Sequence, residues 1–521
     1  MDSDPLKEVQ KSLSSKIARN SFWYGVEVGG GLLSTLLITV AIARAIGPQR
    51  LGYFNYIYWL SNTAGGLGSL GIPAATAKYM AEYLAGGEKG IARAIFFATL
   101  RIQTIIASLM MAVGWALVVA KVDLPYRNAG LLLVASILPR MIAFIPSQAN
   151  ASAENVAANT RAALAGSLTY VAAVALSLTL GWDLLGIAAG VFLSACVELG
   201  AKLIPVMRWI TKLPSGELPA VVKRRMIVFS SQNMVLLVLN MVVWDRSDIV
   251  FLRILQSDTR QLAFFSVAFS IIEKLLLIPQ SFAGGVGVSQ FAEYGRDRQR
   301  LLRMTATAAK YVFLCGLPLL VGVAAISKPL IGAVYGSQYL PMIRVFQLMA
   351  LFAIPRTILF PAYNLLLATE NQKVLVIWNC VCGVVNVVLD LVLIPLTGAV
   401  GAAAANGIAQ ALASIGVWVF VCRHFSLELD LAFFWRLSVV GLFMAMAELF
   451  IVWFFPGWRA IPIGTGIGLV VLVLGLRFVS ILTLEDRQRL LRLAHLVPGR
   501  ARGWASWLIA FLIPISPEPA V

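Results

Sequence analysis

The sequence predicts an all-α polytopic membrane protein, and composition is the first observation that carries this prediction. Hydrophobic residues make up 59% of the 521 residues and charged residues only 13%, with a mean hydropathy of +0.83. A soluble globular protein carries roughly 25% charged residues, because water must wet its surface. Most of the surface of this chain is therefore expected to face lipid.

Apolar runs long enough to cross the hydrocarbon core of a bilayer are the second observation. They predict about fourteen spanning helices. The first run is too long for a signal peptide, so we expect an uncleaved span. The expected spans are residues 21–43, 52–73, 94–119, 129–150, 162–181, 185–206, 226–244, 262–284, 308–327, 345–368, 374–396, 398–421, 433–455 and 460–480.

An internal repeat is the third observation. LGYFNYIYWLSN from position 51 recurs as LAFFSVAFSIIE from position 262, and LPRMIAFIP from 138 recurs as IPRTILFP from 354. LLGIAAGVF from 184 recurs as AVGAAAANG from 399, so the offsets are 211, 216 and 215 positions. Six helices per repeat keep the two halves parallel. This predicts two lobes around a central space, an architecture typical of transporters.

The predicted organisation follows from the repeat and from the short connections between spans. We expect a cytoplasmic tail (1–20), an N-lobe (21–206), a cytoplasmic linker (207–225), a C-lobe (226–421), two added spans (422–480) and a basic cytoplasmic or interfacial tail (481–521). No connection is long enough to fold as a separate domain outside the membrane. In the last tail, GWASWLIAFLIP is too short to span and is expected to lie at the interface.

The net charge of +17 has two candidate explanations, an anionic partner such as nucleic acid or the topology of the membrane protein. With the N-terminus inside and the spans alternating, every large basic cluster falls on the cytoplasmic face, as the positive-inside rule expects. These clusters are residues 7–19, 223–225, 296–303 and 487–492. We therefore expect both termini in the cytoplasm and no nucleic-acid partner.

The sequence offers no pattern for catalysis or metal binding. The pair Cys380 and Cys382 has no further cysteine or histidine nearby, and the two histidines, His424 and His495, stand apart from any catalytic group. We expect no enzyme activity, no cofactor and no metal.

Charges inside the predicted spans are the candidate functional residues, because each costs roughly 2.5–3.5 kcal/mol on insertion scales. Glu273 and Lys274 are adjacent and point about 100° apart on a helix, so they cannot simply satisfy each other. The isolated intramembrane charges are Glu27, Arg140, Glu273, Lys274, Arg356 and Asp390.

Other intramembrane charges have simpler explanations. Glu198 and Lys202 are four residues apart and can neutralise each other on one helix face. Glu448 lies in an added span and suits a structural contact. Arg101 and Lys310 are near enough to helix ends to extend toward the membrane surface.

The two Pro-Arg sites, at Arg140 and Arg356, are the strongest candidates. Proline kinks a membrane helix, and such breaks are tolerated where they line protein-buried or watery space. The planar guanidinium suits bidentate binding of phosphate oxygens. The alternative is that each arginine binds a freed carbonyl or a carboxylate such as Glu27. Repetition in both halves favours a shared role.

Two longer stretches resemble a known family. NSFWYGVEVGG running to ARAIGPQRLGYFNY, followed by LGSLGIPAATAKY, is similar to the first two spans of prokaryotic polysaccharide transporters. These are the O-antigen (Wzx-type) flippases of the multidrug/oligosaccharidyl-lipid/polysaccharide (MOP) exporter superfamily. The stretch from Leu365 to Gln410, with its asparagine-bearing helix, I-P and G-x-x-G-A-A, resembles that family's tenth to twelfth spans. The resemblance covers nearly all of residues 15–480.

This resemblance implies a MATE-like V of two lobes around a cavity lined mainly by spans one, two, four, seven, eight and ten. It also implies a polyprenyl-diphosphate-linked oligosaccharide as substrate, moved from the cytoplasmic to the outer leaflet of a bacterial or archaeal cytoplasmic membrane. Membrane lipids and the polysaccharide polymerase or export machinery would be partners. Carried over by helix, the residues on cavity helices are Glu27, Arg140, Asp245, Arg246, Asp248, Glu273, Lys274 and Arg356. Asp390 lies on the eleventh span, outside that set.

The resulting hypothesis assigns two groups of residues. Arg140 and Arg356 would hold the diphosphate, one from each lobe, with Glu273, Lys274 and Arg246 also facing the substrate. Proton or sodium coupling would fall to Glu27, Asp390, Asp245 and Asp248.

Three alternatives stay open. A lipid II flippase shares the diphosphate head of the substrate. A cation-coupled multidrug exporter should prefer carboxylates and aromatic rings in its cavity. An integral-membrane polymerase or glycosyltransferase should carry a sizeable extramembrane loop or acidic motifs at the membrane surface.

Overall fold

The computed structural model is helical along the chain, and no strand occurs in the residues that it describes. The chain divides into two compact units, which meet in sequence between Ala263 and Phe264 and are treated separately. The described residues are 38–153, 155–244, 247–293, 297–369, 371–479, 481–494 and 500–513.

Ten helices in the described residues are long and apolar enough to cross a membrane. This confirms the predicted all-α polytopic class, whereas the predicted count of fourteen is approximate. The predicted span 21–43 lies mostly outside the described residues. The predicted span 345–368 is divided into separate short helices, so it is absent from those ten.

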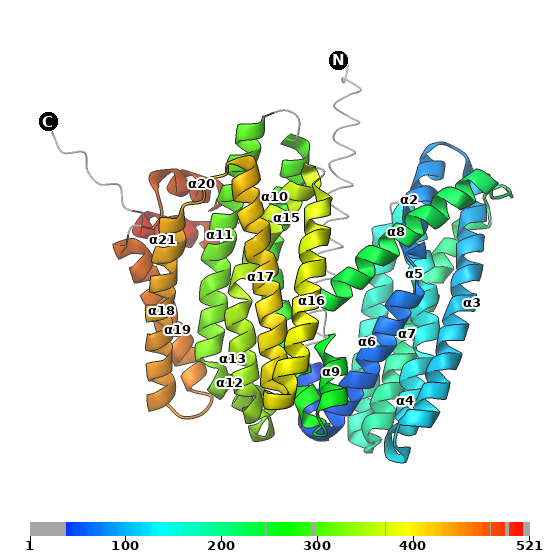
Figure 1. Cartoon of the computed structure of the whole chain (residues 1–521), viewed down its shortest axis with the longest axis horizontal. Coiled ribbons are helices and arrows are strands. Elements are labelled where there is room, and N and C mark those ends of the chain that lie inside the picture. The colour runs from blue at the N-terminus through cyan, green and yellow to red at the C-terminus, as the bar shows by residue number, and fades with distance from the viewer. Residues whose placement is uncertain are drawn as a thin grey trace. The chain divides into compact units, whose positions relative to one another are not determined.

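Unit 1 begins, in its described part, with a helix over residues 38–68. In Figure 1, α8 runs obliquely to the other helices of this unit. α6 packs along α7, α3 packs against α5, and α2 contacts α3, α5 and α8. The helices that follow residues 38–68 are α2 (Ile72–Ala85), α3 (Lys89–Lys121), α4 (Leu124–Ala135), α5 (Ile137–Ser152), α6 (Val156–Leu180), α7 (Asp183–Ile210), α8 (Ala220–Trp244) and α9 (Asp248–Leu255).

Unit 2 follows along α10 (Arg260–Glu293), which starts in the last residues of unit 1. α16 packs along α17, α18 packs along α19, and α11 contacts both α13 and α18. The helices of this unit are α11 (Arg298–Ala325), α12 (Ser327–Tyr335), the 3-10 helix η1 (Ser337–Met342), α13 (Ile343–Phe352), α14 (Ile354–Thr357), α15 (Leu359–Ala368), α16 (Gln372–Thr397), α17 (Ala399–Phe425), α18 (Leu431–Phe454), α19 (Ala460–Phe478), α20 (Leu484–Ala494) and α21 (Arg500–Leu512).

Two helix pairs at equivalent positions of the predicted repeat, α6–α7 and α16–α17, share their local structure. The chain enters both pairs by the same turn. The backbone N–H of Asn155 donates to the Asn150 carbonyl at 2.8 Å, and the N–H of Asn371 donates to the Leu366 carbonyl at 2.8 Å. Both donors and both acceptors are 216 positions apart, the offset of the two Pro-Arg sites.

In each helix pair, the second helix approaches the first closely at an equivalent glycine. A Cβ on Gly186 would collide with Ser177 of the preceding helix, and a Cβ on Gly401 would collide with the backbone of Leu393. The glycines are 215 positions apart and their neighbours 216. Glycine is therefore required at this position of each repeat, because the two helices approach too closely for a side chain.

Both Pro-Arg sites follow an interruption of the helix, as the prolines predict. α4 ends at Ala135 and α5 begins at Ile137, and α13 ends at Phe352 before the single turn of α14. Proline has no N–H, so Pro139 and Pro355 cannot donate to the carbonyls four residues before them. The expected span 129–150 lies within the candidate span Leu124–Ser152, interrupted as the proline predicts, whereas the expected span 345–368 is divided into short helices.

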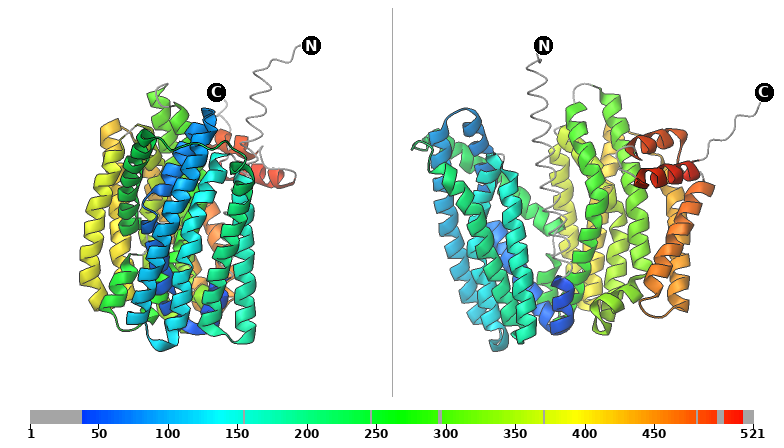
Figure 2. Two further views of the ribbon diagram at one scale, coloured as in Figure 1. Left: turned by 90° about the vertical axis from the view of Figure 1, so that its right-hand side faces the viewer. Right: turned by 180° about the vertical axis from the view of Figure 1, so that it is seen from behind.

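The last helices of unit 2 lie across the end of the α18–α19 pair, as both views show (Figures 1 and 2). α20 starts with a capping box. The hydroxyl of Thr483 accepts from the Asp486 N–H at 3.3 Å, and the carboxylate of Asp486 accepts from the Thr483 N–H at 2.9 Å. Helix α21 packs on α20 and α19.

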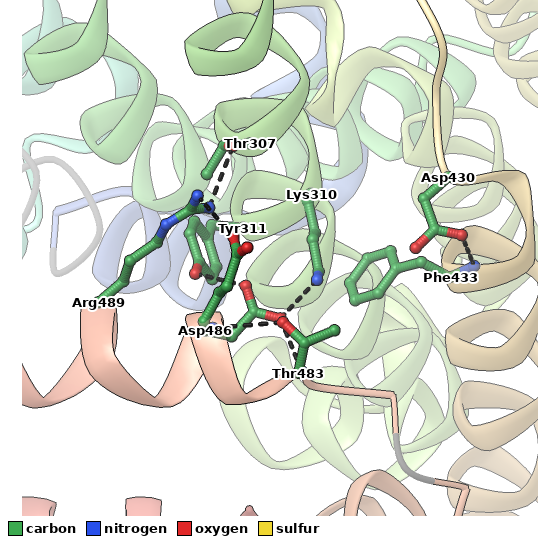
Figure 3. A network of polar contacts seen from close by, with 9 residues as sticks. Thr307, Lys310, Tyr311, Asp430, Phe433, Thr483, Asp486 and Arg489 are labelled. Carbon is green, nitrogen blue, oxygen red and sulfur yellow. Dashed lines mark hydrogen bonds and ion pairs between the residues drawn. The ribbon is translucent and has the colours of Figure 1, made fainter.

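Asp486 also ties α20 to α11 (Figure 3). Lys310 Nζ lies 2.5 Å from the Asp486 carboxylate, and the Tyr311 hydroxyl donates to it at 2.8 Å. Burial would raise the pKa of Asp486, but the hydrogen bonds from Lys310, Thr483 and Tyr311 lower it below its ordinary value. The ammonium group of Lys310, expected near the end of its helix, is therefore paired with a carboxylate of α20.

Two further predicted contacts are present. Lys202 and Glu198 pair on α7 at 2.5 Å. Glu448 is buried on α18, where its carboxylate lies against Gly322 of α11 and Gly468 of α19, so it is part of the helix packing.

Candidate functional site

Arg140 lies on α5, just after the helix interruption in unit 1. Its guanidinium donates hydrogen bonds to the side-chain oxygen of Asn62 and, at 3.4 Å, to the hydroxyl of Tyr58. The guanidinium carbon also lies 4.9 Å from the centre of the Tyr58 ring, a cation–π distance. Both partners are on the helix over residues 38–68. Neither carries a charge.

Arg356 lies on α14, just after the helix interruption in unit 2. Its guanidinium forms a bidentate ion pair with Glu273 of α10, in which the second N–H donates to Oε2 at 3.1 Å. It also donates to the side-chain oxygen of Gln410 on α17 at 3.1 Å. The arginine side chain is 12% exposed and the glutamate 32% exposed, so the pair is largely screened from its surroundings.

The two arginine sites are equivalent in the repeat, and so are their first partners. Arg140 and Arg356 are 216 positions apart, and Asn62 and Glu273 are the last residues of the segments that recur 211 positions apart. Each arginine donates to the partner of its own unit. The hydrogen bond from the arginine to its partner is therefore present in both units, whereas only the partner in unit 2 carries a charge.

This difference in charge decides what each site can do chemically. Glu273 neutralises Arg356 and occupies both arms of its guanidinium. In the described part of unit 1, no acidic side chain pairs with Arg140. Among the described residues Arg140 is held by neutral groups at a partly exposed position, so an anion can approach it without displacing a described counter-charge.

The other predicted site residues have contacts of their own. Lys274 donates to the Ser270 hydroxyl one turn earlier on α10, at 3.1 Å. Asp390 is buried on α16, 3.4 Å from the side-chain amide of Asn386, and Asp248 is buried in the first turn of α9. Glu27, Asp245 and Arg246 lie outside the described residues.

Sequence reasoning missed three neutral residues of these sites, Tyr58, Asn62 and Gln410. None of the three carries a charge, and charge is what makes a polar residue stand out in an apolar span. A signal for Gln410 existed, because it stands four residues after Asn406 in an otherwise apolar helix and donates to it at 3.0 Å. The described residues contain no cluster of three or more histidine, cysteine, aspartate or glutamate side chains that could hold a metal.

Comparison with known protein families shows to which family the chain belongs. Residues 41–344, more than half of the sequence, match the family described as polysaccharide biosynthesis protein. The chain belongs to that family. No curated protein gives a significant sequence match. The resemblance inferred from the opening spans is therefore confirmed at the level of the family.

Solved structures show which fold this polysaccharide biosynthesis protein has. The lipid II flippase MurJ in an inward closed conformation superimposes with a TM-score of 0.71 at 15% identity, covering 88% of this chain and 98% of that one. An inward-facing multidrug resistance MATE family transporter of the MOP superfamily gives a TM-score of 0.64 at 13% identity, covering 75% and 94%. A MOP superfamily transporter from Pyrococcus furiosus gives 0.57 at 13% identity, covering 79% and 95%.

At these identities the superpositions establish the fold alone. The chain has the fold of MOP-superfamily transporters, which confirms the predicted class. The same fold occurs in a lipid II flippase and in multidrug transporters, so the substrate has to be inferred from the family and from the residues of the chain itself.

Proposed function

We propose that this protein is a flippase for a polyprenyl-diphosphate-linked oligosaccharide. It would move the repeat unit of an O-antigen, exopolysaccharide or capsule from the cytoplasmic to the outer leaflet by alternating access. Membership of the polysaccharide biosynthesis family and the fold shared with MOP transporters support this proposal. The observation that carries it is the charge of Arg140, whose side-chain hydrogen bonds within the described residues go to the neutral groups of Asn62 and Tyr58.

The chemistry of such a substrate requires a cation of this kind. A lipid diphosphate carries two or more negative charges that must cross about 30 Å of hydrocarbon. A guanidinium offers two parallel N–H donors to phosphate oxygens and replaces part of the lost hydration. Arg140 is already oriented by the Asn62 amide and the Tyr58 ring, so it can accept the diphosphate without first losing a counter-ion.

Arg356 would contribute differently from Arg140. Its fork already holds the Glu273 carboxylate, so binding of a diphosphate oxygen would exchange one anion for another. We propose that Arg356 joins the substrate only when it parts from Glu273, with Lys274 and Arg246 supplying further positive charge. The polyprenyl tail would stay in lipid while the head group crosses.

The remaining assignments belong to the same proposal. A bacterial or archaeal cytoplasmic membrane, with both termini in the cytoplasm, is the location that the basic clusters favour. Coupling to protons or sodium would involve Glu27, Asp245, Asp248 or Asp390. The polymerase or export machinery of the polysaccharide would receive the product, and no catalytic step is assigned to the chain.

Two alternative functions can be weighed against these residues. An exporter of organic cations would hold its substrate beside Arg140, whose charge would repel it. A lipid II flippase would use the same arginine, because its substrate also carries a diphosphate. Rescue of cells that lack their lipid II flippase would support that alternative, and failure to rescue at normal protein levels would support the oligosaccharide.

The test of the proposal uses cells that depend on this protein for surface polysaccharide. Arg140→Ala should abolish export at normal protein levels, and Arg140→Lys should recover only part of it, because lysine lacks the planar fork. Arg459→Ala, which removes an exposed cation outside both sites, is the matched control and should export normally. Full export by Arg140→Ala would contradict the proposal.

A further inference from the structure

A groove of about 810 Å³ runs between α3 and α8 in unit 1, closed at one edge by the start of α2. From α3, Thr99, Ile102 and Ile106 line it at helical spacings of three and four. From α8, Met226, Ile227 and Ser230 line it on one face of the helix, and nine further residues complete the lining. One continuous face of each helix therefore forms a wall of the groove.

The groove exists because α8 is held to α2 and not to α3. Gly71, at a backbone φ of +71°, lets the Ser230 carbonyl approach so closely that any side chain there would collide with it. Arg225 pairs with Glu82 of α2 at 3.2 Å, which fixes the start of α8. Helix α8 thus crosses away from α3 and leaves the space open.

The groove is open at the surface of unit 1. Ile102 is 45% exposed, Ile105 60% and Ile227 60%, and all three line it. Helix α3 is one of those long and apolar enough to span the membrane. A hydrocarbon chain from the surrounding bilayer can therefore enter from the side, where it would cover apolar surface.

Two cations, and no acidic residue, are among the lining residues. They are Arg101 of α3 and Lys223 of α8, and neither forms an ion pair with a described acidic side chain. Lys223 belongs to the basic start of α8, at the level where the positive-inside rule places lipid head groups. An uncompensated pair of cations beside an apolar groove attracts an anionic head group attached to a hydrocarbon chain.

Two of the three hydroxyl groups that line the groove are engaged within their own helices. The Thr99 hydroxyl donates to the Ile95 carbonyl at 2.8 Å, and the Ser231 hydroxyl donates to the Val228 carbonyl at 2.9 Å. Both hydroxyls donate to backbone carbonyls of their own helices, so neither donor is available to a glycan. A phosphate and an acyl chain, by contrast, need only the two cations and the apolar walls.

A second groove on α3 is less suited to an anion. It has a volume of about 450 Å³ and is lined by Lys121 and Arg253. There the guanidinium of Arg253 lies 5.5 Å from the centre of the Tyr53 ring, whose hydroxyl donates to Asp123 at 3.2 Å. An acidic group thus stands beside that groove, and its lysine serves as a matched control.

We propose that the groove between α3 and α8 binds an anionic phospholipid of the surrounding membrane. Arg101 and Lys223 hold its phosphate, and the apolar faces of α3 and α8 hold an acyl chain. The lipid fills the space between the two helices and joins α8 to α3. The site is separate from the arginine sites described above and does not depend on which substrate the protein carries.

Native mass spectrometry of the purified full-length protein tests this site, with phosphatidylglycerol and phosphatidylcholine of identical acyl chains. The first lipid should bind about tenfold more tightly as phosphatidylglycerol than as phosphatidylcholine, because both carry a phosphate but the choline cation of phosphatidylcholine cancels its net charge and is repelled by Arg101 and Lys223. The variant Arg101→Ala/Lys223→Ala should lose this preference, whereas Lys121→Ala should retain it. Equal affinity for both lipids in the unaltered protein would overturn the proposal, as would an unchanged preference in the double variant.

Two further measurements keep the test decisive. Ile105→Trp fills the groove but leaves both cations in place, so it should weaken the first binding of both lipids even if the double variant does not fold. Polyprenyl diphosphate is added as a competitor at equal concentration. If it displaces phosphatidylglycerol from the unaltered protein but not from the double variant, the groove belongs to the substrate path and the assignment to a phospholipid is wrong.

Discussion

Asn62 and Glu273 occupy equivalent positions of the internal repeat, and each accepts a hydrogen bond from the arginine of its own unit. The amide leaves the charge of Arg140 in place, whereas the carboxylate cancels that of Arg356. The two equivalent arginine sites therefore differ in net charge because one side chain, at the position of Asn62 and Glu273, differs. In a low-dielectric environment this difference outweighs small differences in packing.

Replacing Asn62 by glutamate should make the first site like the second. The new carboxylate would pair with Arg140 and remove an interaction with the diphosphate of about 1.5–3 kcal/mol. Polysaccharide export should then fall about ten- to hundredfold, measured in cells at matched protein levels. Asn62→Ala, which loses the hydrogen bond but keeps the charge of Arg140, should export far more than Asn62→Glu. Equal export by both variants would show that the charge of Arg140 is not what matters.

The ion pair between Arg356 and Glu273 should be measurable by a double-mutant cycle. Glu273→Gln and Arg356→Gln are each expected to lower the stability of the purified protein, because the partner left behind is largely buried. The double variant should recover part of the loss, giving a coupling energy of about 1–3 kcal/mol. Thermal unfolding in detergent is the measurement. Strictly additive effects would mean that the two side chains do not interact.

Asp486 should hold α20 against α11. Asp486→Asn keeps the capping box but leaves Lys310 without its counter-ion, at a cost of about 3–5 kcal/mol for a buried pair. Amide hydrogen exchange of α20 should accelerate. Glu485→Gln, which removes an exposed pair with Arg489 at 3.2 Å, should change exchange little. Similar exchange in both variants would exclude Asp486 as the anchor.

The same contact should depend on pH in a defined direction. The pKa of Asp486 is lower in the folded protein than its ordinary value, so the carboxylate stabilises the docked helix above that ordinary value. Its contribution should be lost as the pH falls through the lowered pKa. The exchange rate of α20 is therefore expected to stay constant from neutral pH down to about 4 and to rise only below it, after correction for intrinsic exchange.

The helix contact at Gly401 should not tolerate a side chain. Gly401→Ala would place a methyl group against the backbone of Leu393, which cannot move aside as a side chain could. We expect destabilisation of about 1–3 kcal/mol. Gly466→Ala on α19 is the matched control, because nothing lies within 4 Å of the position of its Cβ. That variant should be neutral or slightly more stable in thermal unfolding, since alanine favours a helix.

The local pattern of the sequence was enough to predict much of the fold. Apolar runs define the spans because every turn of a helix that faces lipid has to present apolar side chains. Equal offsets define the repeat because duplicated turns keep their glycines and asparagines, as Gly186 and Gly401 show. The prolines at Pro139 and Pro355 predict interruptions because their missing N–H is a local property. The count of fourteen spans is approximate, because the expected span 345–368 is divided into short helices.

The partners of the arginines were decided only by the tertiary structure. Arg140 meets a residue 78 positions away and Arg356 one 83 positions away, and no local pattern selects Asn62 or Glu273 from the other polar residues of the spans. Sequence alone determined that two arginines lie at equivalent helix breaks in a membrane. Folding decided that one keeps its charge and the other loses it, because a charge is neutralised only by what packs beside it.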